Sequence, residues 1–595
     1  MRTTTTPETV AELIARQWGD HRPGLKHPAT ATAPGAAAGT VVLSRHRTAQ
    51  ESAARAALLV DLLPPGAEPH IAVLLENTPE FPFWLGAAAL AGAAVAGINP
   101  TRRGPELARD ILHTDCRILV TEPAHLPLLR GLDLPGVRIL VTGTEEYADL
   151  LAPYAAAAPG EAVAVRPGPG PGSRFLLYFT SGSTGAPKAA VCTQGRLAAA
   201  GASLARGFDV TPDDVHYVCM PLFHGNAVIA DWLPALVGGA PVALRRRFSA
   251  SAFLDDVRAY GATYFTYVGR AVQYLLATDP RPDDRDHCLR LGFGTEAGAV
   301  DAARFAERFG VRLVEGYGAT EGGASVRRTP DTPPGALGRA APGDDLAVVD
   351  PETGAECPPA AFDGRGRLRN GSAAIGELVN RGRSLFEGYW RNPEAEAART
   401  RDGWYWTGDL FYRDADGFLY FAGRTDDRLR VDSENLAAAV IENILARWAP
   451  AAAVAVYAVP DEAAGDQVMA AIALRQGEEF RPEAFEAFLA AQPDLGTKMA
   501  PRYVRIVRTM PTTATNKIHR VALRRAAFLP RPPSPGAPGP DPVWWRPRSA
   551  PGRPGAAGGA AGTPGTAGYR LLEADSLAAL LAAYAAHGRA GLLEG

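Results

Sequence analysis

One segment of the chain decides its fold, and it reads Tyr178-Phe179-Thr180-Ser181-Gly182-Ser183-Thr184-Gly185-Ala186-Pro187-Lys188. It begins at the end of an apolar, strand-like run and combines hydroxyl side chains, two glycines and a lysine. Glycine lets the backbone approach an anion closely, hydroxyl and N–H groups donate to phosphate oxygens, and an ammonium adds positive charge. The order is not the Walker pattern, because Pro187 precedes the lysine and no serine or threonine follows it. The segment therefore predicts a phosphate-binding loop of another kind.

Around this loop, up to about residue 420, short apolar runs alternate with helix-like stretches such as residues 250–260 and 300–309. Alternation at this spacing is typical of an α/β fold, in which helices pack on mostly parallel sheets. The strand-like runs lie at residues 71–75, 117–120, 137–141, 175–179, 215–220, 241–244, 263–268 and 311–314.

The pattern predicts four parts along the chain. Residues 1–422 are expected to form a large N-terminal domain of several subdomains, and residues 423–528 a small, mobile α+β domain with a strand at 454–459 and a helix at 482–491. Residues 529–568 are about half proline and glycine, which predicts a disordered linker. Residues 569–595 are expected to carry a C-terminal helix that opens at Asp575-Ser576.

Composition excludes several classes of protein. The formal net charge is −3 over 595 residues, without the basic excess or stripe typical of a nucleic-acid binder. Five scattered cysteines, an odd number without a CxxC pair, argue against a disulfide framework or structural zinc and favour a reducing compartment. The histidines include no HExxH spacing.

No targeting signal or membrane span is expected. Residues 1–7 are rich in threonine and lack an apolar core, so they do not resemble a signal peptide, and Thr9 to Glu12 is predicted to cap a helix. Residues 81–98 carry no charge, but more than half are alanine or glycine and Pro82 interrupts them, which favours a buried helix. We therefore expect a cytoplasmic protein with at most peripheral membrane contact.

Lysine is rare in this chain. Of the 61 basic residues only four are lysine, namely Lys26, Lys188, Lys498 and Lys517. A lysine ammonium is a compact charge, whereas an arginine guanidinium is a planar fork, so the two are not interchangeable. The surviving lysines are therefore candidates for sites that require a compact charge.

The phosphate-loop segment and several further segments resemble the adenylate-forming enzymes, which include acyl-CoA synthetases, free-standing adenylation domains and firefly luciferase. The resemblance covers about residues 60–528, and Lys188, Lys498 and Lys517 fall where the family pattern has a lysine. Residues 263–276 and 308–321 are most similar to long- and very-long-chain fatty acyl-CoA ligases, including the fatty-acid transport proteins. The further segments are MPLFHGN (220–226), GTE (294–296), YGATE (317–321), WYWTGD (404–409), GRTD (423–426) and NKIHR (516–520).

The resemblance implies a role for each matched residue. Lys188 and the hydroxyl loop would hold the β- and γ-phosphates of ATP, and Glu321 would bind Mg²⁺. Lys517 would reach between the substrate carboxylate and the α-phosphate, His224 would border the acyl pocket, and Asp426 would be the hinge. Tyr317 would stack on adenine, while Asp409 and Arg424 would hold the ribose. The nucleotide-binding set is then Thr180, Ser181, Gly182, Ser183, Thr184, Gly185, Lys188, Gly294, Thr295, Glu296, Tyr317, Gly318, Thr320, Asp409, Arg424 and Lys517.

The implied reaction is ATP-dependent activation of a fatty acid to acyl-AMP, with release of pyrophosphate, followed by transfer to CoA. One alternative acceptor is the pantetheine of an acyl carrier protein. An amino-acid-adenylating domain is disfavoured, because such domains place an aspartate near the position of His224. A fatty-acid uptake protein with decayed catalysis is also disfavoured, because Lys188, Glu321, Asp409 and Lys517 are all present.

Two positions depart from the family pattern. Asn516 precedes the catalytic-lysine position where the family usually has glycine, and asparagine tolerates left-handed backbone. Ser433 stands where the family usually has a glycine that lies against the pantetheine channel. A hydroxymethyl group there could hinder CoA, so the sequence supports adenylation better than thioester formation.

Overall fold

The computed structural model describes residues 8–29, 39–159, 168–180, 188–530, 539–547 and 568–593, except 342, 365, 383–385, 426–427, 432–433, 464, 497 and 514–516. Ser181 to Gly185, the expected hinge Asp426, and the departures Ser433 and Asn516 lie outside the described residues. The chain divides into two compact units, which do not follow the predicted boundary at residue 422. The first holds Met1–Ala297, Asp301–Ser325 and Arg383–Tyr405, and the second holds Gly298–Val300, Val326–Gly382 and Trp406–Gly595.

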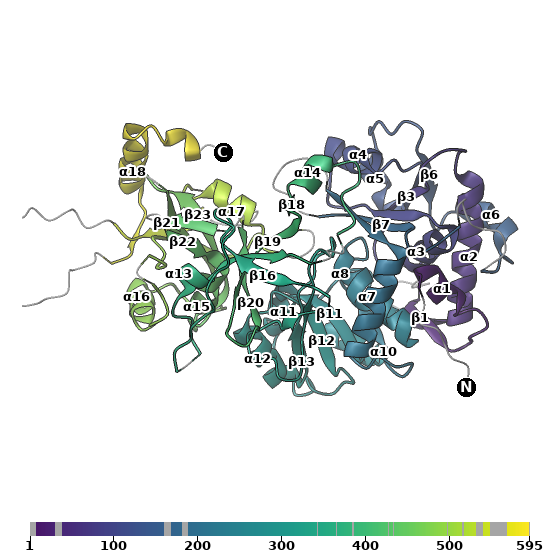
Figure 1. The fold of residues 1–595 in the computed structure, drawn as a ribbon, viewed down its shortest axis with the longest axis horizontal. Helices are drawn as coiled ribbons and strands as arrows, with labels where there is room; N and C mark the ends of the chain where they lie inside the picture. The colour runs from purple at the N-terminus through teal and green to yellow at the C-terminus, as the bar shows by residue number, and fades with distance from the viewer. Residues whose placement is uncertain are drawn as a thin grey trace, which may run out of the picture. The chain divides into compact units, whose positions relative to one another are not determined.

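The first unit contains two sheets, and its α/β architecture confirms the predicted fold class (Figure 1). The six-stranded sheet has the order β6-β5-β3-β4-β7-β8 and is parallel except at the β7–β8 edge. The crossovers from β3 to β4 and from β5 to β6 each lead to a neighbouring parallel strand, as expected for alternating elements. Its strands are β3 (His70–Leu74), β4 (Ala94–Gly97), β5 (Ile118–Thr121), β6 (Arg138–Val141), β7 (Arg174–Phe179) and β8 (Ala189–Thr193).

The seven-stranded sheet of the first unit has the order β13-β12-β11-β9-β10-β1-β2. It is parallel from β13 to β1, and β2 adds antiparallel to β1. Its strands are β1 (Pro23–Pro28), β2 (Thr40–Ser44), β9 (His216–Val218), β10 (Val242–Leu244), β11 (Tyr264–Val268), β12 (Leu291–Thr295) and β13 (Arg312–Glu315).

A helical layer joins the two sheets into one core. A single apolar cluster links Val73 of β3, Trp84 of α3 (Glu80–Ala91) and Val218 of β9. Every residue from Phe81 to Ala91 in α3 is buried, because the helix is apolar on all sides. This confirms the buried helix predicted for the uncharged run. Other helices of the unit are α1 (Val10–Ala15), α2 (Arg45–Leu62), α4 (Gly104–His113), α7 (Gln194–Gly207), α9 (Leu233–Gly238), α10 (Phe253–Tyr260), α11 (Gly269–Leu276) and α12 (Ala299–Phe309).

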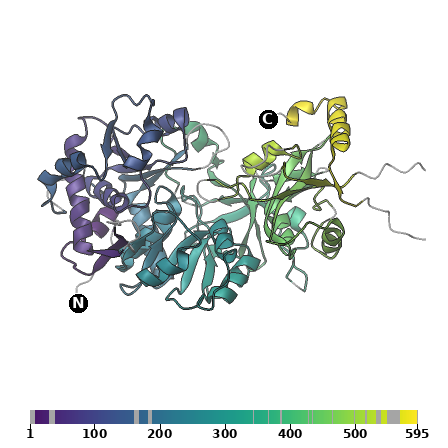
Figure 2. The ribbon, with the colours of Figure 1, turned by 180° about the vertical axis from the view of Figure 1, so that it is seen from behind.

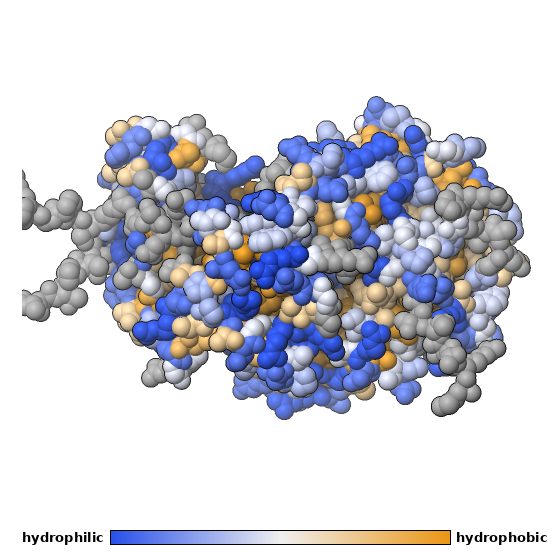
Figure 3. Space-filling view, in the orientation of Figure 1, coloured by the Kyte–Doolittle hydropathy of each residue, from blue (hydrophilic) through white to orange (hydrophobic). Residues whose placement is uncertain are grey.

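On the face drawn in Figure 3, hydrophilic residues cover most of the described surface, and apolar residues appear in small patches. Of the helices that the structure describes, each is too short or too polar to cross a bilayer.

The described part of the second unit is built on two larger sheets and two two-stranded pairs, seen from behind in Figure 2; one of these pairs joins β14 (Val326–Arg327) and β15 (Arg339–Ala340). One sheet joins β16 (Leu346–Val349), β17 (Gly376–Asn380), β19 (Trp404–Arg413) and β20 (Leu419–Arg424), and β21 (Arg428–Val431) pairs with β22 (Glu434–Ala437). The other sheet has the order β23-β24-β25-β26-β27, with β23 (Ala451–Pro460), β24 (Asp466–Leu474), β25 (Tyr503–Val507), β26 (Val543–Trp545) and β27 (Arg570–Leu571).

Side chains of β24 alternate between two cores, as strand geometry requires. Val468 and Ile472 face one core with α15 (Ala438–Leu445) and α16 (Pro482–Ala490). Met469 and Ala471 face the other core, which also holds residues of α17 (Arg520–Ala526) and α18 (Ala574–Ala586).

The predicted linker differs from the structure at one point. β26 lies inside residues 529–568 and pairs antiparallel with β25, and β27 then pairs with β26. The pattern Val543-Trp544-Trp545 is a strand former, and the free edge of β25 gives it backbone partners that composition cannot reveal. Residues 543–545 therefore form a strand inside the range for which composition predicts a linker, and the helix expected near Asp575 is present.

Candidate active site

The two ends of the predicted phosphate loop are held together by a hairpin. β7 and β8 pair antiparallel up to Phe179 and Ala189, and the Thr180 N–H donates to the Lys188 carbonyl over 3.0 Å. The half-buried Lys188 therefore lies opposite Thr180 at the start of the loop. This arrangement brings together two of the predicted phosphate ligands, while the residues between them are not described.

Three further motifs meet at one edge of the seven-stranded sheet. The parallel strands β9, β11, β12 and β13 end at this edge. Tyr267 of β11, Gly294 of β12 and Glu315 of β13 are register partners there. His224 follows β9, residues 294–296 close β12, and residues 317–321 follow β13. Ligands of open α/β sheets bind outside the carboxyl ends of the strands, which is where these predicted residues lie.

Close backbone packing explains one glycine of this edge. A Cβ atom on Gly294 would lie 2.3 Å from the Tyr267 carbonyl oxygen, a distance that real Cβ atoms do not reach. Glu296, two residues after Gly294 in the same motif, has a φ of 70°, which is uncommon for a residue with a side chain. Close packing therefore fixes the backbone at Gly294, and the backbone at Glu296 is strained.

Sequence reasoning missed Glu315, the last residue of β13. Its Oε1 atom accepts a hydrogen bond of 2.7 Å from the Tyr267 hydroxyl and one of 3.1 Å from the Ala297 N–H. Burial raises the pKa of Glu315 to about 7. The carboxyl group thereby ties β11 to the turn that carries Gly294 to Glu296. An acidic residue ending a buried strand, directly before Gly316-Tyr317, was the available signal.

Glu321 is buried and has a partner that is remote in the sequence. The Tyr389 hydroxyl donates to its Oε1 atom over 3.0 Å. Tyr389 is placed there because its neighbours extend the β8 edge, with Trp390 N–H donating to the Ala189 carbonyl over 2.8 Å. Burial, with the Glu321 carboxylate, raises the pKa of Tyr389 well above its usual range, so it remains a neutral donor. No local pattern in the sequence predicts the contact of Tyr389 with Glu321.

Thr320 is held from two directions. Its carbonyl accepts a hydrogen bond of 3.1 Å from Arg196 Nη2, and the Nε atom of Arg196 donates to Glu387 over 2.8 Å. Its hydroxyl packs on Gly225, where a Cβ atom would come within 2.7 Å of Thr320 Oγ1. The turn of residues 317–321, which includes Tyr317 and Gly318, is therefore anchored to α7 and to the start of α8 (Gly225–Ala227).

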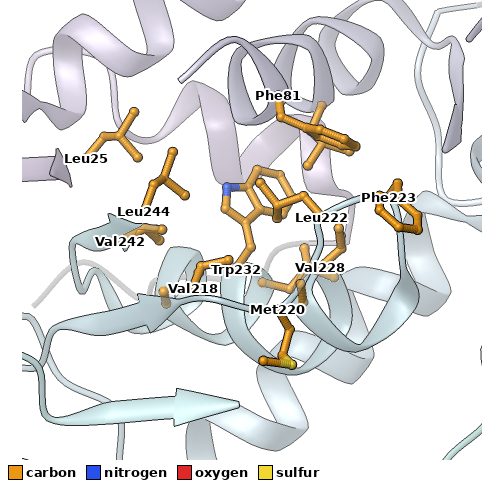
Figure 4. Packing of buried hydrophobic residues seen from close by; sticks show 14 of the residues in the cluster. Leu25, Phe81, Val218, Met220, Leu222, Phe223, Val228, Trp232, Val242 and Leu244 are labelled. Atoms are coloured by element: carbon orange, nitrogen blue, oxygen red, sulfur yellow. The ribbon is translucent and has the colours of Figure 1, made fainter. Parts of the chain in front are cut away.

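His224 stands at the N-terminus of a short helix that continues into an unusual turn. It is half-buried at the N-cap of α8, and the chain then forms a wide π-helical turn at Val228–Trp232 before α9. Figure 4 shows Trp232 of this turn directed toward Phe81 of α3. The fully buried Asp231 fixes the turn, because its carboxylate accepts a hydrogen bond of 2.9 Å from Thr266 and lies 3.0 Å from His216 Nδ1. Turns of this kind often occur at functional sites.

In the second unit, the structure pairs Asp409 with Arg424. They are register partners on β19 and β20, and Arg424 Nε lies 3.5 Å from Asp409 Oδ1. The backbone before Asp409 is shaped by Gly408, which has a φ of 74° and donates its N–H to Glu377 over 2.7 Å. The Asp409 carboxyl group is buried and the Arg424 side chain is half-exposed. The two predicted ribose ligands thus form one cluster.

Lys517 belongs to the same unit and is half-buried in a short hairpin. Its N–H donates to the Thr513 hydroxyl over 3.2 Å, and its carbonyl accepts from the Thr513 N–H over 2.7 Å. An isolated bridge between Thr512 and Ile518 continues this pairing. These contacts hold the backbone of Lys517 and Ile518 against Thr512 and Thr513.

Two family models match the chain. The AMP-binding enzyme family matches residues 26–390, and the AMP-binding enzyme C-terminal domain matches residues 440–517. The chain belongs to the AMP-binding enzymes, which confirms the resemblance stated from the sequence. It is an acid–thiol ligase that uses ATP to activate an acyl group.

Two relatives and one solved structure are similar to this chain over most of its length. The chain is 52% identical over 479 residues to steroid-22-oyl-CoA synthetase of Rhodococcus jostii (strain RHA1), covering 80% of this chain and 85% of that protein. It is 45% identical over 467 residues to a medium/long-chain-fatty-acid–CoA ligase of Mycobacterium marinum (strain ATCC BAA-535 / M), covering 78% and 88%. The fold is similar to that of ATP-bound MatB from Rhodopseudomonas palustris, with a TM-score of 0.72, 24% identity, and 87% and 98% of the chains covered.

Proposed function

We propose that this ligase activates a carboxylic acid with a large apolar acyl group to acyl-AMP, releases pyrophosphate and transfers the acyl group to CoA. The carrying observation is the shared sheet edge where the motifs after β9, β12 and β13 meet. Ligands of open α/β sheets bind at such an edge, so it would place nucleotide and acyl group next to each other. CoA is favoured over a carrier protein as the acceptor because the similar proteins are named as CoA ligases.

Residues of the first unit would bind the phosphates and the metal. Lys188 and the Thr180-to-Gly185 loop would hold the β- and γ-phosphates, and backbone of Gly294 to Glu296 and Tyr317 to Thr320 would enclose the adenine. Glu321 fits a Mg²⁺ site, because Mg²⁺ is usually bound by one or two carboxylates plus substrate phosphates, and Tyr389 orients the carboxylate. Mg²⁺ would neutralise charge on the phosphates during transfer.

Residues of the second unit would complete the reaction. The buried Asp409 carboxylate would accept hydrogen bonds from the ribose hydroxyls, with Arg424 beside it. Lys517 would stabilise negative charge between the attacking carboxylate and the α-phosphate, a role that needs a preorganised point charge. A rotation about Asp426 would then withdraw Lys517 and admit the pantetheine, as in hinge-controlled enzymes.

Two acyl classes are candidates. Residues 263–276 resemble fatty acyl-CoA ligases, which favours a long-chain fatty acid. The higher identity to a steroid-22-oyl-CoA synthetase, 52% against 45%, favours a carboxylated steroid side chain. Both classes share an apolar body that His224 and the Val228–Trp232 turn would border.

A substrate panel tests the proposal. The purified enzyme is incubated with ATP, Mg²⁺ and fatty acids of increasing length or steroid-22-oic acids, first without and then with CoA, and acyl-AMP and acyl-CoA are detected by mass spectrometry. We expect acyl-AMP without CoA and acyl-CoA with it for at least one class. Absence of both products across the panel, with ATP unconsumed, would contradict the proposal.

A further inference from the structure

Residues 568–593 follow the part of the chain that the family models match, and they pack on both faces of the sheet β23-β24-β25-β26-β27. Tyr569 is buried in the core that holds Trp448 and Phe485, and its hydroxyl donates to the Pro501 carbonyl. Its N–H donates to Glu486 of α16 over 2.7 Å. β27 follows at once and extends the sheet, so this segment is anchored before α18 begins.

The helix α18 contributes Leu580 and Tyr584 to the core on the opposite face of the same sheet, and Leu523 of α17 belongs to that core as well. Leu580 and Leu593 are buried there, and Tyr584 is fully buried and donates its hydroxyl to the Pro460 carbonyl. Arg589 donates from Nε to the Asp461 carbonyl over 2.9 Å and from Nη2 to the Gly465 carbonyl over 3.3 Å. These contacts fix the helix at several separate points.

The core beneath α18 is also the one that supports the predicted catalytic lysine. Met510 lies in it before the Lys517 hairpin, Ile518 packs against it directly after the lysine, and Leu523 of α17 is fully buried in it. Arg520 adds a second anchor, with Nη2 2.9 Å from both carboxylate oxygens of Glu442. Met510 before the lysine segment and Ile518 after it therefore rest on a core to which α18 contributes.

We propose that residues 568–593 are a positioning element that holds the Lys517 segment in its catalytic geometry. The inference rests on the proposed role of Lys517 in adenylation. A charge donor acts fully only when it is held close to its productive geometry by its supporting residues. Removing the segment would expose the core around Ile518 and Leu523 and allow the lysine hairpin to move, while the residues that bind ATP in the first unit stay in place.

The test combines a stop after residue 567 with Lys517→Ala in a double-mutant cycle. Pyrophosphate release and the KM for ATP are measured for the wild type, each change alone and both together. The stop is expected to lower the kcat of adenylation at least tenfold and to change the KM for ATP less than twofold. In the Lys517→Ala background the stop is expected to have no further effect, because the residue through which it acts is gone.

Point variants of the full chain cover the case in which the shortened chain does not fold. Tyr584→Ala removes the buried ring of α18, Tyr584→Phe keeps the ring and should restore most of the activity, and Leu581→Ala on the exposed face is the matched control. Equal losses for Tyr584→Ala in the wild-type and Lys517→Ala backgrounds, or no loss at all, would overturn the inference. An unchanged Lys517→Ala single variant would instead contradict the proposed function.

Discussion

The hydroxyl of Tyr389 donates a 3.0 Å hydrogen bond to Oε1 of Glu321, although 68 residues separate the two in the sequence. The contact exists because residues 388–390 add to the edge of β8, next to the hairpin that carries Lys188. Tyr389 therefore links the predicted Mg²⁺ ligand in the turn after β13 to β8, the strand that follows the phosphate loop, although it belongs to neither motif.

Tyr389→Phe tests this coupling. The variant removes the donor that orients the Glu321 carboxylate while keeping the ring, so the Mg²⁺ concentration for half-maximal adenylation should rise about tenfold. Pyrophosphate release is titrated with Mg²⁺ at saturating ATP. Tyr154→Phe is the control, because it also loses a tyrosine–carboxylate hydrogen bond, to Asp61, but at an exposed site. An unchanged Mg²⁺ dependence would separate Tyr389 from the metal site.

Lys517→Ala is expected to lower the rate of acyl-AMP formation by roughly 10²–10³, because one preorganised charge donor is lost. ATP binding, measured by calorimetry, should change little. Lys517→Arg should restore little activity, since a planar guanidinium does not occupy the position of an ammonium. Lys498→Ala is an informative companion, because Lys498 is another of the rare lysines. Near-normal acyl-AMP formation by Lys517→Ala would exclude the assignment.

Glu315→Gln is expected to change the pH dependence of stability. The pKa of Glu315 is raised from 4.5 to about 7 in the folded protein, so the stability associated with its neutral form is present below about pH 4.5 and is lost as the pH rises through 7. Glutamine keeps a carbonyl oxygen for both donors at Oε1 and carries no charge. The variant should therefore be more stable than the wild type at pH 8.

The measurement is urea unfolding of both proteins at pH 5 and pH 8. The gain for Glu315→Gln should shrink toward pH 5, where the wild-type carboxyl group is largely protonated. Glu307→Gln on α12 is the control, because Glu307 is exposed and should give the same difference at both pH values. A gain of equal size at both values would contradict the raised pKa.

Asp426→Pro tests the proposed hinge. Proline fixes φ near −65°, so a position that must rotate between half-reactions should lose thioester formation more than adenylation. The two half-reactions are measured separately, as pyrophosphate release and as acyl-CoA formation from preformed acyl-AMP. Ser433→Gly should accelerate only the second step if the hydroxymethyl group hinders CoA. Equal losses in both steps for Asp426→Pro would argue against a hinge.

The fold could be predicted where local pattern and tertiary environment agree. The runs at residues 71–75 and 263–268 became β3 and β11 because a buried parallel strand needs only a short apolar segment. β4 was hidden inside the uncharged run at 81–98, where helix and strand follow each other with the same composition. β26 was hidden by surrounding prolines, because its pairing depends on a partner edge that sequence composition does not encode.

The candidate site likewise contains residues that the sequence could predict and residues that it could not. Lys188, Glu321 and Lys517 stand in ordered motifs, so their positions could be named from the sequence. Glu315 and Tyr389 act through contacts with residues far away in the chain, and such contacts exist only after the sheets have formed. Their chemistry depends on burial and neighbours, which a single sequence does not report.

The π-helical turn at Val228–Trp232 has a consequence for how the acyl specificity of this enzyme can change. A wide turn holds one residue more than an α-helical turn, and loss of that residue would rotate everything beyond it by about 100° around the helix axis. A one-residue insertion or deletion after His224 would thus present new side chains to the substrate while β9 and β11 stay in place. With the turn bordering the acyl group as proposed, length variation there would give natural or laboratory evolution a discrete way to exchange one acyl class for another.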